Sequence, residues 1–355
     1  MTDLVRRSIE IILANQVPSG AYIASPNFPA YQYCWFRDGA YTAYAMDRLG
    51  EHHSAHRFHE WAARVINARE AKIEHAIDKA NGGQPLSGTD ILHTRYKYDG
   101  QDGLEEEWPN FQLDGFGTWL WSMGEHQRLS EAPIPRSWLK AAQLTAEYLS
   151  ALWRLPCFDC WEEYPELVHT STLAAIYGGL HAETSFSSEG RESTLSEIQT
   201  YLKQNAIADG YFIKAPGRQD VDASLVSLST PYRVVHPQDE RMRRTITRIE
   251  QTLRQGGVHR YPSDTYYGGG EWLLLSAWLG WYYADTGEFG LAQDLLAWVE
   301  GQASPDGGLP EQVPEALIHP PSYSIWLERW GPVANPLLWS HAMYLILFQA
   351  LSDTG

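Results

Sequence analysis

The stretch 336–351, PLLWSHAMYLILFQAL, is apolar on nearly every side of the helix that its spacing predicts. The stretch 272–283, WLLLSAWLGWYY, has the same character. A helix that faces water needs only one apolar stripe, so a helix that is apolar all round is typically covered by protein on every side. Both stretches therefore predict helices that lie inside a ring of other helices.

Helical periodicity continues along the rest of the chain, and signals for strands are weak. The expected helices lie near 2–16, 38–50, 53–79, 113–128, 136–153, 165–181, 187–206, 221–230, 239–255, 271–285, 288–301 and 336–352. These are about twelve helices, and their boundaries are loose by a few residues. Residues 211–214 are expected to form a short hairpin arm.

The links between these helices differ in length in a regular way. Links that leave even-numbered helices are mostly short, such as 50–52 and 286–287. Links that enter even-numbered helices are mostly long, namely 17–37, 82–112, 154–164, 256–270 and 302–335. Long loops without structure of their own are usually functional. If the helices alternate up and down, the long loops gather at one end, and the even helices close as an inner ring within the odd ones.

Composition limits the partners of the chain. The net charge of −17 repels phosphate backbones and anionic lipids, so we expect neither nucleic acid nor a membrane as a partner. The 15 Trp exceed what a core requires, and aromatic faces stack on sugar rings, although a large core that happens to use Trp would give the same composition. A small neutral oligosaccharide is therefore the favoured partner. Residues 1–16 carry charges among their apolar positions, which argues against a signal peptide and for a cytoplasmic protein.

Cysteine and histidine give little support for a redox or metal centre. Three cysteines do not make a disulfide framework, and the CxxC of Cys157 and Cys160 has no second pair to complete a zinc set. Spacings that suit a metal occur at His52, His53, His56 and His59. These histidines start an expected outer helix, so we favour a solvated face. We expect no metal and no cofactor.

Two segments carry candidate catalytic carboxylates. Glu162 and Glu163 follow Trp161, and like charge beside a dry aromatic wall raises a carboxyl pKa, which keeps a proton available near neutral pH. Acids that favour a helix N-terminus would give the same pattern. Glu311 lies in the Gly- and Pro-rich segment 307–312, where a rigid turn could hold a water molecule, although an ordinary surface loop would look the same.

Two further segments combine charge with aromatic rings. In the segment 31–38, YQYCWFRD, Arg37 can donate and Asp38 can accept, which suits two sugar hydroxyls, and Trp35 offers a stacking face. A salt bridge at a helix start is the alternative there. The segment 260–272, RYPSDTYYGGGEW, places one cation among three tyrosines and a tryptophan, and its glycines let the backbone approach a ligand closely.

Taken together, these segments resemble the glucoamylase family, glycoside hydrolase family 15. The matching positions are Tyr31, Trp35, Arg37 and Asp38, then Trp161, Glu162 and Glu163, then 260–272, then Glu311, and last Trp339 and Ser340. They follow the family's order and span nearly the whole chain. The element 260–272 is long enough to be specific, whereas Trp-Glu-Glu alone is not.

The resemblance implies an all-α fold, an (α/α)6 barrel of six inner and six outer helices. We expect a single catalytic domain over 1–355 that departs from many family members, because it has neither an N-terminal β-sandwich nor a starch-binding domain. Glu162 would be the general acid and Glu311 the general base. The substrate-binding residues would be Tyr31, Trp35, Arg37, Asp38, Trp108, Trp161, Glu163, Arg260, Tyr266, Trp272 and Trp339.

The activity that the resemblance implies is that of an inverting exo-α-glucosidase that releases β-glucose. Short substrates are favoured, with isomaltose and isomalto-oligosaccharides first. An α-1,4-specific glucoamylase or an α,α-trehalase of the same family is the alternative. A non-catalytic sugar-binding protein is the rival class, but it would have little reason to keep both Glu162 and Glu311. The segment 108–115 matches the family only loosely and 313–335 has no counterpart, so linkage preference stays open.

Overall fold

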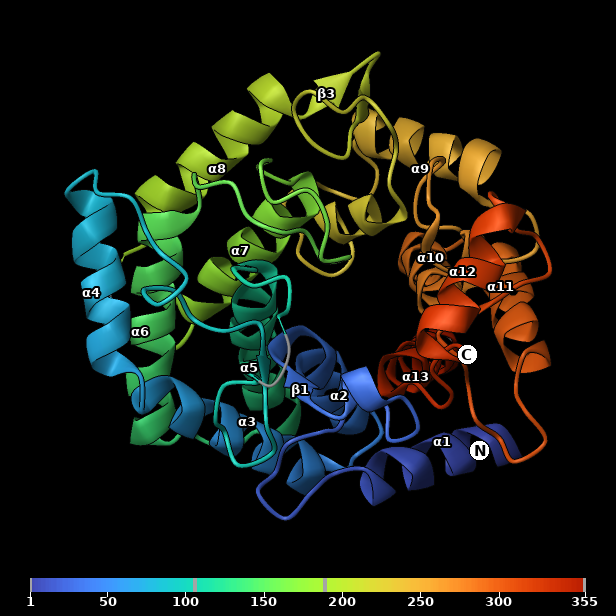
Figure 1. Ribbon diagram of the computed structural model, residues 1–355, viewed down its shortest axis with the longest axis horizontal. Helices are drawn as coiled ribbons and strands as arrows, with labels where there is room; N and C mark the ends of the chain where they lie inside the picture. Colours follow the sequence, from blue (N-terminus) through green and yellow to red (C-terminus); the bar gives the residue numbers. More distant parts are fainter. Residues whose placement is uncertain (1, 105–106, 188–189, 354–355) are drawn as a thin grey trace.

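Helices dominate the computed structural model, which describes residues 2–104, 107–187 and 190–353 (Figure 1). The α-helices are α1 (Asp3–Ala14), α2 (Phe36–Arg48), α3 (His52–Asn67), α4 (Glu70–Asn81), α5 (Asp114–Ser130), α6 (Arg136–Leu152), α7 (Thr170–Glu183), α8 (Glu192–Asn205), α9 (Glu240–Leu253), α10 (Leu273–Thr286), α11 (Phe289–Gly301), α12 (Pro320–Trp330) and α13 (Leu338–Ser352). Short 3-10 helices are η1 (Pro29–Tyr31), η2 (Ala223–Leu228) and η3 (Tyr266–Gly268).

Six of these elements form a closed inner ring. In order around the ring, α2, α5, α7, η2, α10 and α13 each pack against the next, and α13 packs against α2. Helices α1, α3, α6, α8, α9 and α11 surround them (Figure 1). The fold is therefore the (α/α)6 barrel expected from the sequence, and the inner elements are the even-numbered segments of the alternation.

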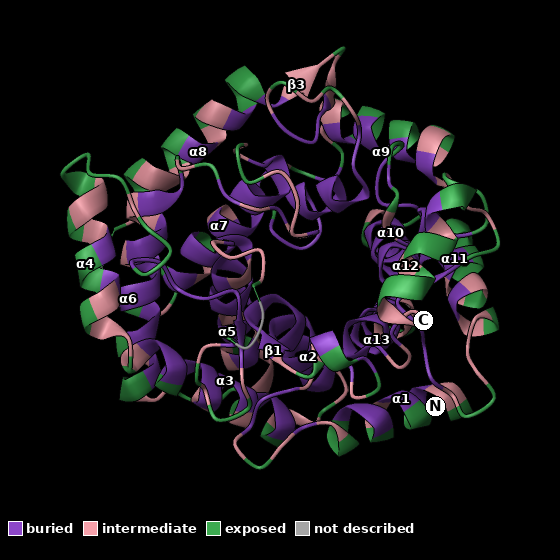
Figure 2. Cartoon of the chain, viewed as in Figure 1, coloured by how far each residue is buried: buried purple, intermediate pink, exposed green. Residues whose placement is uncertain are grey.

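Burial follows this division into rings. All residues of α10 from Leu273 to Ala284 are buried, and α13 is buried from Leu338 to Leu347. Buried residues fill the inner ring in Figure 2, and exposed residues lie on the outward faces of the outer helices. The two apolar stretches thus lie where their composition predicts, because no face of either helix is suited to water.

Glycine allows the closest contact within the inner ring. A Cβ at Gly117 of α5 would lie 2.4 Å from the carbonyl oxygen of Ala175, and a Cβ at Gly179 of α7 would lie 2.3 Å from the carbonyl oxygen of Gly117. Since real Cβ atoms do not approach oxygen so closely, α5 and α7 can pack backbone to backbone only with glycine at both positions.

Three short antiparallel strand pairs brace the loops. β1 (Cys34–Trp35) pairs with β2 (Arg95–Tyr96), β3 (Ile207–Ala208) with β4 (Tyr211–Phe212), and β5 (Glu271–Trp272) with β6 (Gln312–Val313). The hairpin arm expected at 211–214 is therefore present as β4. β1 leads directly into α2 and β5 into α10, so strand pairing fixes the loops at the N-terminal ends of these inner helices.

The expected helix at 53–79 is wrong in one respect, because the chain breaks into α3 and α4 at Ala68 and Arg69. The Arg69 guanidinium donates to the carbonyl of Gly100 at 2.8 Å and to Asp102 Oδ1 at 3.1 Å, and it lies over the ring of Tyr96. These contacts hold the loop that follows β2 and favour a turn at Arg69, which helical periodicity does not reveal.

Two other segments differ from the expectation. The helix expected at 221–230 is the shorter 3-10 helix η2, and Pro231 disfavours helical conformation at its C-terminal side. The expected loop 302–335 contains the helix α12, which begins at two prolines. Among the described residues, no helix is both long and apolar enough to cross a bilayer. The single-domain organisation and the cytoplasmic location stay predictions.

Candidate active site

A cavity of about 450 Å³ lies among the long loops at the N-terminal ends of the inner helices. Its lining contains all of the site residues expected from the sequence: Tyr31, Trp35, Arg37, Asp38, Trp108, Trp161, Glu162, Glu163, Arg260, Tyr266, Trp272, Glu311 and Trp339. Side chains that are distant in the sequence therefore meet around one pocket of the size that small ligands occupy. Lining the pocket does not assign a role, so the role of each residue stays a prediction.

A tight turn before α7 presents Glu162 to the cavity. Asp159 Oδ1 accepts from the backbone N–H groups of Trp161 at 3.0 Å and Glu163 at 2.9 Å. Within this turn Glu162 has a φ of 67°, in the left-handed region that costs energy for a residue with a side chain. The Asp159 side chain compensates for that cost, and the strain is typical of a functional position.

The carboxylate of Glu162 is held from two sides. The Trp35 indole N–H donates to Glu162 Oε1 at 2.8 Å, and the Gln112 amide donates to the same oxygen at 3.1 Å. Burial raises the pKa of Glu162, while the charge of Arg37 opposes the change. A carboxyl group in this environment keeps its proton to a higher pH than an exposed glutamate, as a general acid requires.

The loop that carries Glu311 is fastened to the last inner helix. The hydroxyl of Ser340 in α13 donates to the carbonyl of Pro310 at 2.8 Å, and the N–H of Glu311 donates to the carbonyl of Ala334 at 2.9 Å. The residues after Glu311 form β6, which pairs with β5. Contacts on both sides thus keep the backbone of Glu311 in place between α10 and α13.

The side chain of Glu311 is almost fully buried, with 3% of its surface exposed. The Tyr31 hydroxyl donates to Glu311 Oε1 at 3.1 Å, and the Tyr31 and Tyr266 hydroxyls lie 2.9 Å apart. Glu311 Oε2 has no hydrogen-bond partner among the described residues. Burial raises the pKa of Glu311 to about 8, against the opposing effects of Tyr31 and Arg260. The unpaired oxygen can accept a proton from a water molecule.

Arg37 and Asp38 form the floor of the cavity at the start of α2. Arg37 donates to Gln112 Oε1 and to Asp114 Oδ2, each at 3.0 Å. Asp38 Oδ2 is buried and lacks a hydrogen-bond partner within the described ranges, although the Arg37 guanidinium lies 3.5 Å away. Burial also raises the pKa of Asp38 to about 6. The pair therefore offers a fixed donor and an unsatisfied acceptor to a polar ligand.

A second charged group lies across the cavity around Arg260. Its guanidinium binds both carboxylate oxygens of Asp264 and reaches Glu163 Oε1 at 3.3 Å. The Tyr261 hydroxyl donates to Glu163 Oε2 at 2.6 Å. Glu163 is therefore oriented by two donors, which suits a carboxylate that accepts hydrogen bonds from a ligand rather than one that transfers a proton.

Aromatic rings supply the remaining walls. The rings of Trp161 and Trp272 have centroids 5.5 Å apart, and those of Trp35 and Trp108 are 5.9 Å apart. The indole N–H of Trp161 donates to both carboxylate oxygens of Asp222, so its ring is fixed from behind. Flat apolar faces beside a few oriented polar groups are the combination that recognises a sugar ring.

The helix α12 contributes to the cavity in a way that was not predicted from the sequence. Trp326, Arg329 and Trp330 line the cavity, and the Trp326 ring centroid lies 4.9 Å from that of Tyr266. The aromatic spacing within PPSYSIWLERW and the prolines at its start were the available signals for a helix. The structure also adds these lining residues: Ala24, Phe28, Ala30, Glu107, Pro109, Cys160 and Leu337.

All three cysteines are free thiols, as expected from their number. Burial raises the pKa of both Cys157 and Cys160, which keeps these groups protonated and unreactive. Of these two cysteines, Cys160 lines the cavity and Cys157 does not. The solvated face expected for the four histidines of α3 is wrong for His59, which is fully buried because α5 and α6 cover that side of the helix.

Comparison with known families identifies the family of this chain. Residues 2–312 match the model of Glycosyl hydrolases family 15. The chain belongs to this family. As a family 15 member it is a glycoside hydrolase, and the match includes both Glu162 and Glu311.

Relatives of this family 15 chain cover nearly its whole length. An isomaltose glucohydrolase of Kribbella flavida is 41% identical over 98% of this chain and 92% of the relative. A solved glycosidase variant in complex with glucose has a TM-score of 0.95 and 40% identity, over 99% of this chain and 96% of that one. A bacterial glucoamylase complexed with acarbose, 19% identical with a TM-score of 0.72, covers 99% of this chain and 56% of its own, and it supports the barrel fold alone.

Proposed function

We propose that this chain is an inverting exo-α-glucosidase that releases β-glucose from isomaltose and short isomalto-oligosaccharides. One observation carries the proposal: two glutamates from different links, Glu162 and Glu311, line one aromatic cavity, and each has a raised pKa and a fixed backbone. A protein that only binds sugar would gain nothing from burying two such acids, since each burial has a cost.

In the proposed reaction both carboxyl groups act in one displacement, Glu162 as the acid and Glu311 as the base. Neutral Glu162 gives its proton to the glycosidic oxygen as the bond from that oxygen to C1 breaks. Glu311 takes a proton from a water molecule, and the water oxygen bonds to C1 from the other face of the ring. Attack from that face converts an α-glucoside to β-glucose, and this geometry requires carboxyl groups roughly 6.5–9.5 Å apart.

Charged residues of the cavity are proposed to bind the terminal glucose. In this proposal Arg37 and Asp38 bind hydroxyls on one side, and Glu163 and Arg260 bind them on the other, while the tryptophans cover the apolar faces. The hydroxyl of Tyr31, which donates to Glu311, would lie near the ring oxygen. Fixed donors and acceptors of this kind place C1 between the acid and the base before reaction.

The choice of isomaltose rests on similarity. The Kribbella flavida relative, which bears the name isomaltose glucohydrolase, is alignable over 98% of this chain. Trp326 and Arg329 of α12 also line the cavity. A neutral oligosaccharide also agrees with the net charge of −17, because it avoids repulsion between the protein and an anionic ligand.

A panel of disaccharides with detection of the product anomer tests the function. We expect isomaltose to be cleaved with a higher kcat/KM than maltose or α,α-trehalose, and proton NMR should show β-glucose as the first product before mutarotation. Release of α-glucose would mean retention of configuration and would overturn the inverting mechanism. Absence of turnover on all three sugars would leave only a binding protein.

The pH profile of kcat/KM should be bell-shaped, with its limbs displaced to higher pH. Activity requires Glu311 without its proton and Glu162 with its proton, so kcat/KM falls on both sides of the pH range that lies between the two pKa values. Because burial raises both pKa values, both limbs should lie above the ordinary carboxyl range of about 4.3. Initial rates on isomaltose across the pH range in which the protein stays folded measure this. A profile with both limbs at or below the ordinary range would contradict it.

A further inference from the structure

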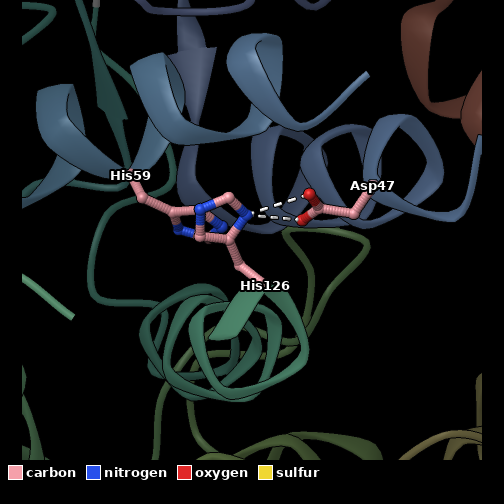
Figure 3. Close-up of side chains that lie close together, drawn as sticks. All are labelled: Asp47, His59 and His126. Carbon is pink, nitrogen blue, oxygen red and sulfur yellow. Dashed lines mark hydrogen bonds and ion pairs between the residues drawn. The ribbon is translucent and has the colours of Figure 1, made fainter. Parts of the chain in front are cut away.

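Three ligand-forming side chains meet far from the sugar cavity, where α2, α3 and α5 cross (Figure 3). Asp47 lies near the C-terminal end of α2, His126 near that of α5, and His59 comes from the outer helix α3. The cavity lies at the N-terminal ends of α2 and α5, so this cluster is at the other end of the barrel. The exposed fractions are 2% for Asp47, 0% for His59 and 4% for His126.

The potential ligand atoms of these three side chains lie within 4.8 Å of one another. Ligands of a zinc ion, each about 2 Å from the metal, lie within about 4 Å of one another. A small movement of the side chains would therefore complete the set. His126 Nδ1 is 2.9 Å from each oxygen of Asp47, which shows that the imidazole and carboxylate already face each other.

His59 is the member whose surroundings require an explanation. Neither of its ring nitrogens has a hydrogen-bond partner among the described residues, although the side chain is fully buried. A neutral imidazole carries one donor and one acceptor, and leaving both unpaired in the interior is costly. The ring nitrogen of a neutral imidazole that carries no hydrogen has a lone pair that can bind a ligand.

We propose that His59, His126 and Asp47 bind a divalent transition-metal ion of the zinc type. Two imidazole nitrogens and one carboxylate oxygen are a donor set that such ions prefer, and a water molecule would complete four-coordinate zinc. The metal would bind one of the two unpaired nitrogens of His59 and neutralise the carboxylate. Harder ions such as Mg²⁺ favour oxygen ligands and fit this set poorly.

Two neighbouring histidines of α3, His52 and His56, lie beside this cluster. His52 Nδ1 lies 2.8 Å from Asp47 Oδ1, and 40% of the His52 side chain is exposed. The exposed His56 has its ring centroid 5.9 Å from that of His126. His52 can therefore orient the carboxylate as outer partners of metal ligands do.

The bound ion would join two inner helices to one outer helix. Such a link acts on the stability of the barrel and not on the sugar, because no member of the cluster lines the cavity. Added zinc should therefore raise the Tm of the full chain by a few degrees at saturating concentration, with kcat on isomaltose unchanged.

Calorimetric titration of the full, chelator-treated chain with ZnCl₂ tests the site. We expect one zinc ion per chain, and at least about tenfold weaker binding in His59→Phe and in His126→Gln. The matched control is His53→Gln, since His53 is exposed on the same helix and should leave binding unchanged. Circular dichroism of each variant shows whether it is folded. Absence of zinc binding by the wild-type chain, or equal binding by folded variants and wild type, would overturn the proposal.

A crystal of the wild-type chain soaked in ZnCl₂ gives a second test that needs no variant. Anomalous scattering at the zinc edge should place the ion within bonding distance of His59 and His126. A peak at the carboxylates of the sugar cavity alone, or ordered water without anomalous signal between the two histidines, would contradict the site.

Discussion

Substitution of Glu311 with alanine is expected to lower kcat on isomaltose by about 10²- to 10⁴-fold, with a much smaller change in KM. The reason is that Glu311 acts on the attacking water, whose proton is transferred only in the transition state. In the proposed complex the glucose ring is held mainly by other groups, among them Arg37 and Arg260. Steady-state rates at saturating isomaltose measure kcat, and calorimetry with glucose checks that the variant still binds sugar.

The control for this variant lies on the same loop. Glu315→Ala removes an exposed carboxylate four residues away and should keep wild-type kcat. Sodium azide adds a further readout, because a small anion can occupy the space of the lost carboxylate and attack C1 directly. A β-glucosyl azide is then the expected product of Glu311→Ala. Wild-type hydrolysis by Glu311→Ala would show that another group activates the water.

Replacement of Glu162 with glutamine should have an effect that depends on the leaving group. On isomaltose we expect a loss of about 10²- to 10⁴-fold in kcat, because the departing sugar oxygen needs a proton. On α-glucosyl fluoride the loss should be far smaller, since fluoride departs without protonation. Glutamine keeps the size of the side chain and can still accept the hydrogen bond from Trp35, so the pocket should remain intact.

The ratio of the two rates separates acid catalysis from a merely structural role. A structural defect would slow both substrates equally, whereas loss of the acid slows only the one with the poor leaving group. Glu166→Gln, an exposed carboxylate just after the catalytic turn, is the matched control and should leave both rates unchanged. Equal loss on the two substrates by a folded Glu162→Gln protein would mean that Glu162 is not the proton donor.

The order of the barrel was predictable because its rule is simple. The helices α10 and α13 are apolar all round, and the alternation of long and short links between helices predicts which helices form the inner ring. The turn at Arg69 and the helix α12 escaped prediction for a physical reason. Arg69 is fixed by carbonyl and carboxylate groups of the loop at 100–102, and such partners are not visible in local periodicity.

The geometry of the site was likewise only partly predictable from the sequence. The motifs indicated which residues meet, but the sequence does not reveal that Asp159 holds Glu162 in a left-handed conformation, or that Gln112 joins Arg37 to Glu162. His59 is the clearest case. Its place at the start of an expected outer helix suggested an exposed face, and only the packing of α5 and α6 against α3 decides that it is buried.

The close glycine contact between α5 and α7 affects the circumference of the inner ring, and through it the distance between the two candidate catalytic carboxyl groups. Glu162 precedes α7, whereas Glu311 precedes α13 elsewhere on the ring, so the gap between them depends on how tightly every pair of neighbours closes. A methyl group at Gly179 would force α5 and α7 apart and widen the circumference. A side chain at either interior glycine would therefore change the spacing of the two carboxyl groups, although neither glycine lines the sugar cavity.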